Sequence, residues 1–385
     1  MVLTKGQSPA EQYLSAYLTH AEVRGRPYSA QALREMLASF SWEKTFFQLA
    51  AIAGSLANFQ LDQGSSLVRL THDSLRRLKL HPNQQMWSIG EFVDKNPDRP
   101  LIHEQCIYFL QAMAILEGRP DGPAPSDLHM AFMLLAANDH LSFWRDADKP
   151  PLPNLELVTA ELCHVARFNR YPDPLRRMVR TAMIFERQPP QGLFADAKNW
   201  EMLQQRAFGC SFTDYFDTFV VPLFMASQQW GASTKSGAYE GPMLNPEQWL
   251  SKTNLPHDWA TGFLQELSIT REEARKQLKA SLRNNGLPHA PVIFIRKPFL
   301  KTDSGHLIAA SPWAVQEQLR GGLWMRFMRA SEKFSKKQET WTSTFGHLFE
   351  MACREVAQEG SKEHGFSEQV ELSKAPGSAD ELEDV

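Results

Sequence analysis

Apolar residues recur at helical spacing over most of the chain. In one helix, Ile107, Leu110 and Met113 fall on a single face. Another has the capping-box pair Thr270 and Glu273 at its start. This pattern predicts helices that begin near residue 9 and continue at 29–40, 43–59, 84–94, 103–118, 126–139, 155–168, 174–187, 193–208, 212–230, 246–250, 257–267 and 270–284.

A different pattern follows residue 290. A short run of β-branched and aromatic residues at 292–295 lies between two prolines. Turn residues at 302–305 come next, and a second apolar run follows at 307–309. Two such runs on either side of a turn are typical of antiparallel strands, so the sequence predicts a β-hairpin near 292–309.

A basic helix is predicted behind this hairpin. Ser311 supplies an N-cap and Pro312 the first helical position. The pair Gly321-Gly322 predicts that this helix is kinked or split in its middle. A solvated helix face accounts for the charges of this helix, and a face that contacts phosphates is the alternative. The basic residues are Arg320, Arg326, Arg329, Lys333, Lys336 and Lys337.

These elements together predict a mainly α fold. Helices fill residues 9–284, the small hairpin follows, and a partial α/β segment ends the chain. Proline clusters and changes in composition divide the chain into a helical domain, a second helical domain, a hairpin with a basic helix, and the start of a nuclease-like domain with an acidic tail. The corresponding ranges are 1–148, 149–288, 289–338 and 339–385.

Composition restricts the classes of function. With 385 residues, 43% of them hydrophobic, the chain can bury a substantial core. Its formal charge of −3 gives no overall basic bias, so nucleic-acid binding requires a local patch. No segment reaches the roughly 20 apolar residues needed to cross a bilayer, and we expect a cytoplasmic protein with no membrane partner. The cysteines, expected to be buried and reduced, are Cys106, Cys163, Cys210 and Cys353.

Signatures of common catalytic sites are missing from the sequence. It contains no HExxH metal motif, no glycine-rich phosphate loop and no GxSxG nucleophile motif. A hydrolase built on His306 or His347 is weakly supported, because no nucleophile is paired with either histidine in the sequence. Zinc is not expected, since the histidines and cysteines lack ligand spacing.

The C-terminal quarter resembles a known class of proteins. These are bacterial, often defence-associated, proteins in which a long helical region precedes a nuclease domain of the PD-(D/E)XK, restriction-endonuclease-like class. The motifs that carry the resemblance are Lys297-Pro298-Phe299, Ser311-Pro312, Gly322-Leu323-Trp324, Phe345-Gly346 and Phe349-Glu350.

The resemblance implies a catalytic role for two carboxylates. Glu350 matches the glutamate on the first helix of the nuclease fold, and Asp384 lies where an aspartate of the second core strand would fall. The glutamate and lysine of the next strand have no counterpart. Such an enzyme uses Mg²⁺ held by several oxygen ligands, so the chain is expected to be a truncated or degenerate relative without activity and without a cofactor of its own. Alternatively, Glu350 is a solvent-facing helix residue and Asp384 part of a solvated acidic tail.

Two hypotheses follow for the function. In the first, the chain is a non-catalytic or truncated part of a nuclease-type protein of defence or repair, with DNA or RNA as its partner. In the second, it is a helical scaffold that binds a protein partner and has no nuclease ancestry.

Overall fold

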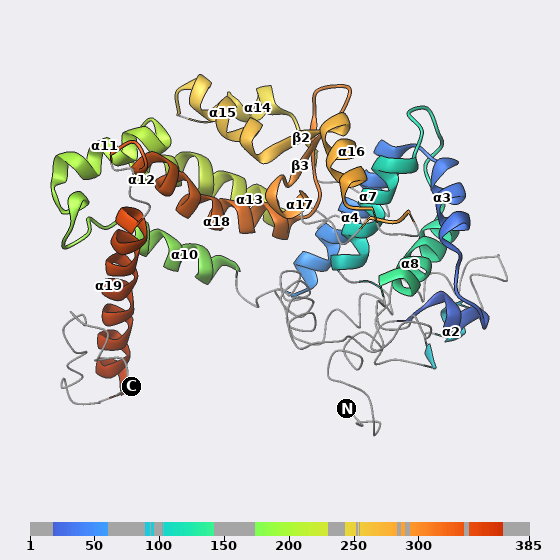
Figure 1. Ribbon diagram of the computed structural model, residues 1–385. Helices are drawn as coiled ribbons and strands as arrows, with labels where there is room; N and C mark the ends of the chain where they lie inside the picture. Colours follow the sequence, from blue (N-terminus) through green and yellow to red (C-terminus); the bar gives the residue numbers. More distant parts are fainter. Residues whose placement is uncertain are drawn as a thin grey trace. The chain divides into compact units, whose positions relative to one another are not determined.

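Helices make up most of the computed structural model of the chain, together with one small mixed sheet (Figure 1). The mainly α fold predicted from the sequence is therefore confirmed. The structure describes residues 18–60, 89–92, 94–95, 102, 104–141, 174–229, 243–251, 253, 255–282, 286–288, 293–334 and 339–364.

The chain forms two compact units, and each of them joins two separate stretches. The first unit contains Met1–Pro174 and Thr218–Leu319, and the second contains Leu175–Asp217 and Arg320–Val385. This grouping differs from the four contiguous segments expected from the sequence. It places the basic residues from Arg320 onward with the C-terminal helix.

Helix α7 (Glu104–Glu117) is the centre of the first unit. Every residue from Glu104 to Leu116 is buried, so this helix has no solvent face. A helix apolar on all sides must be surrounded. Its neighbours in contact are α3 (Ala30–Ala38), α4 (Trp42–Gln60), α8 (Asp127–Leu141) and α16 (Arg271–Ala280).

Smaller helices complete the first unit. Helix α16 begins with the predicted capping box: Thr270 accepts a hydrogen bond from the backbone N–H of Glu273, and the Glu273 carboxylate accepts one from the backbone N–H of Thr270. The same arrangement starts α2 with Thr19 and Glu22. The remaining helices are α2 (His20–Arg24), α13 (Val221–Gln229), α14 (Pro246–Leu250), α15 (His257–Leu267) and α17 (Ile293–Arg296).

The sheet of the first unit has the strand order β1-β4-β3-β2. Its strands are β1 (Met243–Leu244), β2 (Ser268–Thr270), β3 (Phe299–Lys301) and β4 (Leu307–Ala309). Strands β3 and β4 form the hairpin, with Leu300 opposite Ile308, while β2 runs parallel to β3. Helix α16 lies in the connection from β2 to β3, as a parallel pair requires.

The first strand of the hairpin was predicted too early in the chain. A strand was expected at 292–295, but residues 293–295 belong to the short helix α17, and the strand begins only after Pro298, at Phe299. Packing explains the difference: the Phe294 ring is fully buried, 5.5 Å from the ring of Phe46. A buried apolar run of this length suits either a helix or a strand, and tertiary contacts decide between them.

Helix α18 (Pro312–Ser331) runs through its paired glycines without interruption, so the helix is not split there. Its N-cap is the predicted one, since Ser311 Oγ accepts a hydrogen bond from the N–H of Ala314 at 3.0 Å. Ser311 Oγ also bonds the buried Tyr108 hydroxyl. Burial raises the pKa of Tyr108, so this phenol stays protonated and fixes the start of α18 to the centre of the first unit.

Aromatic rings form the core of the second unit, with Phe327 of α18 in the middle. The ring centroid of Phe327 lies 5.5 Å from Trp200, 5.0 Å from Phe208, 5.0 Å from Trp341 and 5.3 Å from Phe185. The helices that contribute these rings are α10 (Pro174–Phe185), α11 (Ala197–Phe208) and α19 (Glu339–His364); α12 (Phe212–Tyr215) and a π-helix at Phe216–Val220 follow α11.

The cysteines differ in their exposure. Cys106 is buried, as expected, and burial raises the pKa of its thiol. Cys210 is half-buried, and burial together with the nearby Asp214 raises the pKa of its thiol to about 11. Cys353 is exposed on α19, which corrects the expectation that all the thiols are buried. Cys163 lies outside the described residues.

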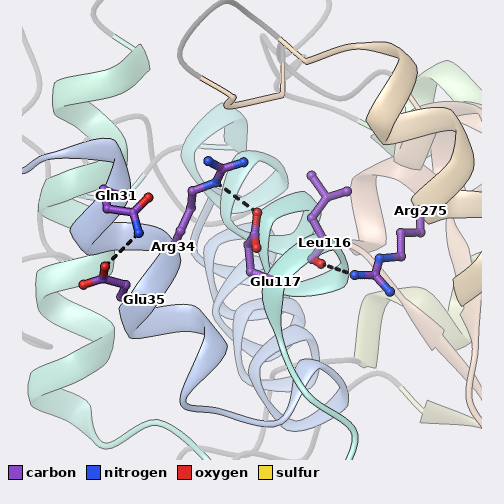
Figure 2. Close-up of polar contacts among 6 residues, drawn as sticks. All are labelled: Gln31, Arg34, Glu35, Leu116, Glu117 and Arg275. Atoms are coloured by element: carbon purple, nitrogen blue, oxygen red, sulfur yellow. Dashed lines mark hydrogen bonds and ion pairs between the residues drawn. The ribbon is translucent and has the colours of Figure 1, made fainter.

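Arginines close the C-terminal end of α7, where the last carbonyl groups of a helix have no partner within the helix. Arg275 Nη2 donates to the carbonyl of Leu116 at 2.9 Å, and Arg271 Nη2 donates to that of Gly118 at 2.6 Å. From the other side, Arg34 pairs with the Glu117 carboxylate at 3.1 Å (Figure 2). The guanidinium of Arg271 also lies 4.8 Å from the ring of Trp42. Positive charge near the C-terminal end of a helix interacts favourably with the helix dipole and so stabilises the helix.

We expect Arg271→Ala to lower the free energy of unfolding by about 1–3 kcal/mol, because it leaves a carbonyl at the end of α7 without its charged donor. The measurement is urea denaturation followed by circular dichroism. Lys276→Ala, an exposed position on the same helix, is the control and should change stability by less than about 0.5 kcal/mol. Equal losses in the two variants would contradict a capping role for Arg271.

Candidate nucleic-acid interface

The exposed side of α18 in the second unit carries three of the predicted basic residues. Arg326, Arg329 and Lys333 follow one another at intervals of three and four, which places them on one side of the helix and of the turn that continues it. Arg329 and Lys333 are exposed and Arg326 is half-buried. The structure therefore brings these three cations together.

Arg320 lies on another side of the same helix. At about 100° per residue, it is rotated by about 120° from Arg326. It is half-buried, whereas Arg329 and Lys333 face solvent. Of the six basic residues expected to form one face, Arg320 thus stands apart, and Lys336 and Lys337 lie outside the described residues.

The orientation of this face follows from the residues behind it. Leu323, Phe327 and Ala330 are buried and fix the inner side of α18 against the other helices of the second unit. Because a helix is rigid about its own axis, this packing turns Arg329 toward solvent. The basic side is thus a consequence of the aromatic core.

Two arginines of this region rest on aromatic rings. The guanidinium carbon of Arg326 lies 5.8 Å from the ring centroid of Tyr215, and that of Arg206, on α11, lies 4.1 Å from the ring centroid of Phe334. Contacts of this kind hold a flexible side chain in place. Phe334 follows Lys333 directly, so Arg206 lies next to the α18 face.

Sequence reasoning did not find Arg206. It belongs to a helix far from α18 in the sequence, and nothing in its local spacing marks it. The only available signal is its position in the last turn of α11, where positive charge stabilises the helix dipole. Stabilisation of a helix end also accounts in part for the positions of Arg329 and Lys333 near the end of α18. The same cations could therefore stabilise the helix and bind phosphates.

The structure gives Glu350 an ion-pair partner. Its Oε1 lies 3.0 Å from Arg354 Nη2, one turn later on α19, and its side chain is 38% exposed. Asp384 lies outside the described residues. Among the residues that the structure describes, no three histidine, cysteine, aspartate or glutamate side chains gather in a way that could hold a metal ion. A single carboxylate shared with an arginine does not fit a Mg²⁺ site, which needs several oxygen ligands.

The hairpin turn holds a second group of polar side chains, in the first unit. Ser304 Oγ lies 3.0 Å from His306 Nδ1 and is also hydrogen-bonded to the Thr302 hydroxyl at 2.9 Å. No nucleophile is paired with His306 in the sequence, and the structure pairs it with a serine. These bonds close a tight turn in which Gly305 has a left-handed backbone, with φ of 84°, so the turn's own geometry accounts for them.

Glu43, at the start of α4, interacts electrostatically with charged residues of this turn. Its pKa is raised above the usual glutamate range, first by burial and then by the negative charge of Asp303, while His306 and Lys44 act in the opposite direction. The other histidine considered for hydrolysis, His347, has its Nδ1 3.0 Å from the side-chain amide of Gln191. Neither arrangement includes the base, nucleophile and orienting group of a catalytic triad.

The chain matches no protein-family model, no curated protein and no solved structure. The resemblance to restriction-endonuclease-like proteins therefore stays a prediction. None of the helices that the structure describes has the length and apolar composition that crossing a membrane requires.

We expect Glu43→Gln to stabilise the protein at about pH 7 and to have no effect near pH 4. A carboxyl whose pKa is raised by folding stabilises the protein only while it is protonated, so the wild type loses stability as the pH rises through that pKa and the amide variant does not. Thermal unfolding across this pH range measures the difference. In an Asp303→Asn background the gain should shrink, because one cause of the raised pKa is gone; an unchanged gain would exclude Asp303 as a cause.

Proposed function

We propose that this chain binds nucleic acid through its phosphates, using the basic side of α18, and does not itself cleave it. The observation that carries the proposal is the alignment of Arg326, Arg329 and Lys333 on one side of α18, with Arg329 and Lys333 exposed and Arg326 half-buried. Like charges repel one another, and one exposed carboxylate, Glu332, accompanies the three cations in the stretch 326–333. A polyanion offsets the remaining repulsion and is a suitable partner of such a side.

Phosphate geometry suits these side chains. Arginine presents a planar fork of donors that matches phosphate oxygens, and ring contacts order Arg326 and Arg206 in advance. With about four cations in reach of one backbone, we expect binding without base specificity, with dissociation constants of about 10⁻⁴–10⁻⁶ M at physiological salt.

The second part of the proposal, that the chain does not cleave nucleic acid, is based on the surroundings of Glu350. Its ion pair with Arg354 neutralises the one candidate metal ligand among the described residues, and no other carboxylate joins it there. A nuclease activity of the restriction-endonuclease-like class would require a further domain to supply Mg²⁺ ligands and a lysine. The link to a defence or repair nuclease remains part of the proposal through the sequence resemblance alone.

Fluorescence anisotropy with labelled DNA and RNA oligonucleotides, single- and double-stranded, tests the proposal. We expect the triple variant R326Q/R329Q/K333Q to bind at least about tenfold more weakly than the wild type on each of them, since each lost phosphate contact removes a share of the electrostatic free energy. Arg320→Gln alone should have little effect, because this residue lies on another side of α18.

The matched control is K276Q/K279Q/R296Q, which removes the same charge from exposed positions of the first unit. If this control loses as much affinity as the α18 triple variant, binding follows net charge and the proposed site is wrong. If the wild type binds none of the oligonucleotides, nucleic-acid binding itself is wrong, and the alternative of a protein-interaction module is favoured.

A further inference from the structure

An acidic segment follows α19 in the chain, and neither the fold nor the proposed function uses it. Residues 366–385, which lie outside the described residues, contain six acidic side chains and one lysine. Four of the acids are close together near the end of this segment and are called the acidic cluster below: Asp380, Glu381, Glu383 and Asp384. A block of like charges repels itself and is typical of a segment that binds an oppositely charged surface.

The basic side of α18 is a surface of that kind. Arg329 and Lys333 are exposed on it, and Arg326 lies beside them. These cations belong to the second unit, which also contains α19. The acidic cluster matches them in sign and nearly in number, so charge complementarity within one chain favours a contact between the two.

The distance to be covered follows from the position of α19. This helix begins beside α18, because the ring centroid of Trp341 lies 5.0 Å from that of Phe327. It then continues for 23 residues to His364, a length of about 35 Å. Arg329 and Lys333 are within two turns of Phe327 along α18. A segment that returns from the end of α19 to the basic side must therefore span about 35–45 Å.

The acidic cluster is far enough along the chain to make this return. An extended chain covers at most about 3.3–3.6 Å per residue, so Asp380, 16 residues after His364, can reach about 53–58 Å from it. The two other glutamates of the segment, Glu368 and Glu371, can reach at most about 25 Å. Chain length therefore allows the acidic cluster to contact the basic side of α18 and excludes the two nearer glutamates.

We propose that the acidic cluster covers the basic side of α18 in the same molecule and so competes with nucleic acid for it. The competition rests on the proposed function, since both partners use Arg326, Arg329 and Lys333. A tether of this kind gives an effective concentration in the millimolar range, so even a contact of about millimolar intrinsic affinity is populated. A nucleic acid supplies many more phosphates than the cluster has carboxylates and displaces it.

The size of the effect follows from the fraction of molecules that are covered. The apparent dissociation constant for nucleic acid rises in inverse proportion to the fraction in which the site is open. If the acidic cluster covers about two-thirds of the molecules, its removal tightens nucleic-acid binding about threefold.

Carbodiimide cross-linking of the full chain tests the contact without nucleic acid, because this reagent joins a lysine amine to a carboxylate that touches it. Mass spectrometry of the monomer should find Lys333 linked to the acidic cluster. The control is Lys198, an exposed lysine of the same unit at the opposite end of α11 from Arg206, which should be linked much less. The links to Lys333 should disappear at about 1 M salt, where the Debye length is about 3 Å.

A shorter tether tests the geometry. Deletion of residues 366–375 keeps the acidic cluster but leaves Asp380 six residues after His364, so that it reaches at most about 22 Å. The links to Lys333 should then be lost. Links that persist in the shortened chain, that form equally at Lys198, or that appear only between two molecules would overturn the proposed contact.

Nucleic-acid affinity tests the competition. The variant D380N/E381Q/E383Q/D384N and the deletion of 366–375 should both bind labelled oligonucleotides about threefold more tightly than the wild type. E368Q/E371Q, which removes the carboxylates that cannot reach α18, should change the affinity little. Equal affinity in all four proteins would overturn the competition. A cross-link at Lys333 in a chain that binds no oligonucleotide would overturn the proposed function and leave the contact established.

Discussion

Stacking around Phe327 is the interaction on which the orientation of α18 and α19 in the second unit depends. The ring lies nearly parallel to Trp200, with 5° between the planes, and to Trp341, with 17°. Trp200 fixes α11 against α18, and Trp341 fixes the beginning of α19 against the same residue. The rotation of α18 about its axis is thereby set, and with it the exposure of Arg329. The side of α19 that carries Phe349 is exposed for the same reason, because the opposite side, including Trp341 and Leu348, is buried. Aromatic pairs of this kind add to the effect of buried area and restrict geometry.

In the first unit, the main constraint is the pairing of polar groups at the end of the buried helix α7. A helix buried on every side, as α7 is, leaves its terminal carbonyl groups in a region where water cannot reach all of them, and unpaired buried carbonyls are costly. Side chains of two other helices, Arg271 and Arg275 of α16 and Arg34 of α3, satisfy or balance this end. Within α7, Gln111 reaches the carbonyl of Ala310 at 2.8 Å and so ties the helix to the segment between the sheet and α18. The central helix thus organises its surroundings through polar contacts as well as through apolar packing.

Local patterns predicted the fold better than the site. Capping residues such as Thr270 and Ser311 mark helix starts because their hydrogen bonds involve only the next few residues, and the structure confirms both. The strands β1 and β2 were missed since two or three residues carry too little pattern, and the run at 292–295 was assigned to the wrong element because distant rings decide its conformation. The ion pair of Glu350 with Arg354 was not predicted, although its spacing of four residues favours such a pair in any helix. Arg206 was out of reach, because its proximity to Phe334 exists only after folding.

The central claim is that a few cations on α18 form one phosphate-binding side. The dependence of nucleic-acid affinity on salt concentration tests this claim most directly, because each neutralised phosphate contributes about 0.7–0.9 to the slope of log affinity against log salt. With about four cations at the site, the account predicts a slope of about −2.8 to −3.6 for the wild type and a slope of about −0.7 to −0.9 once Arg326, Arg329 and Lys333 are neutralised, because Arg206 remains. A slope that does not change when these charges are removed would contradict it.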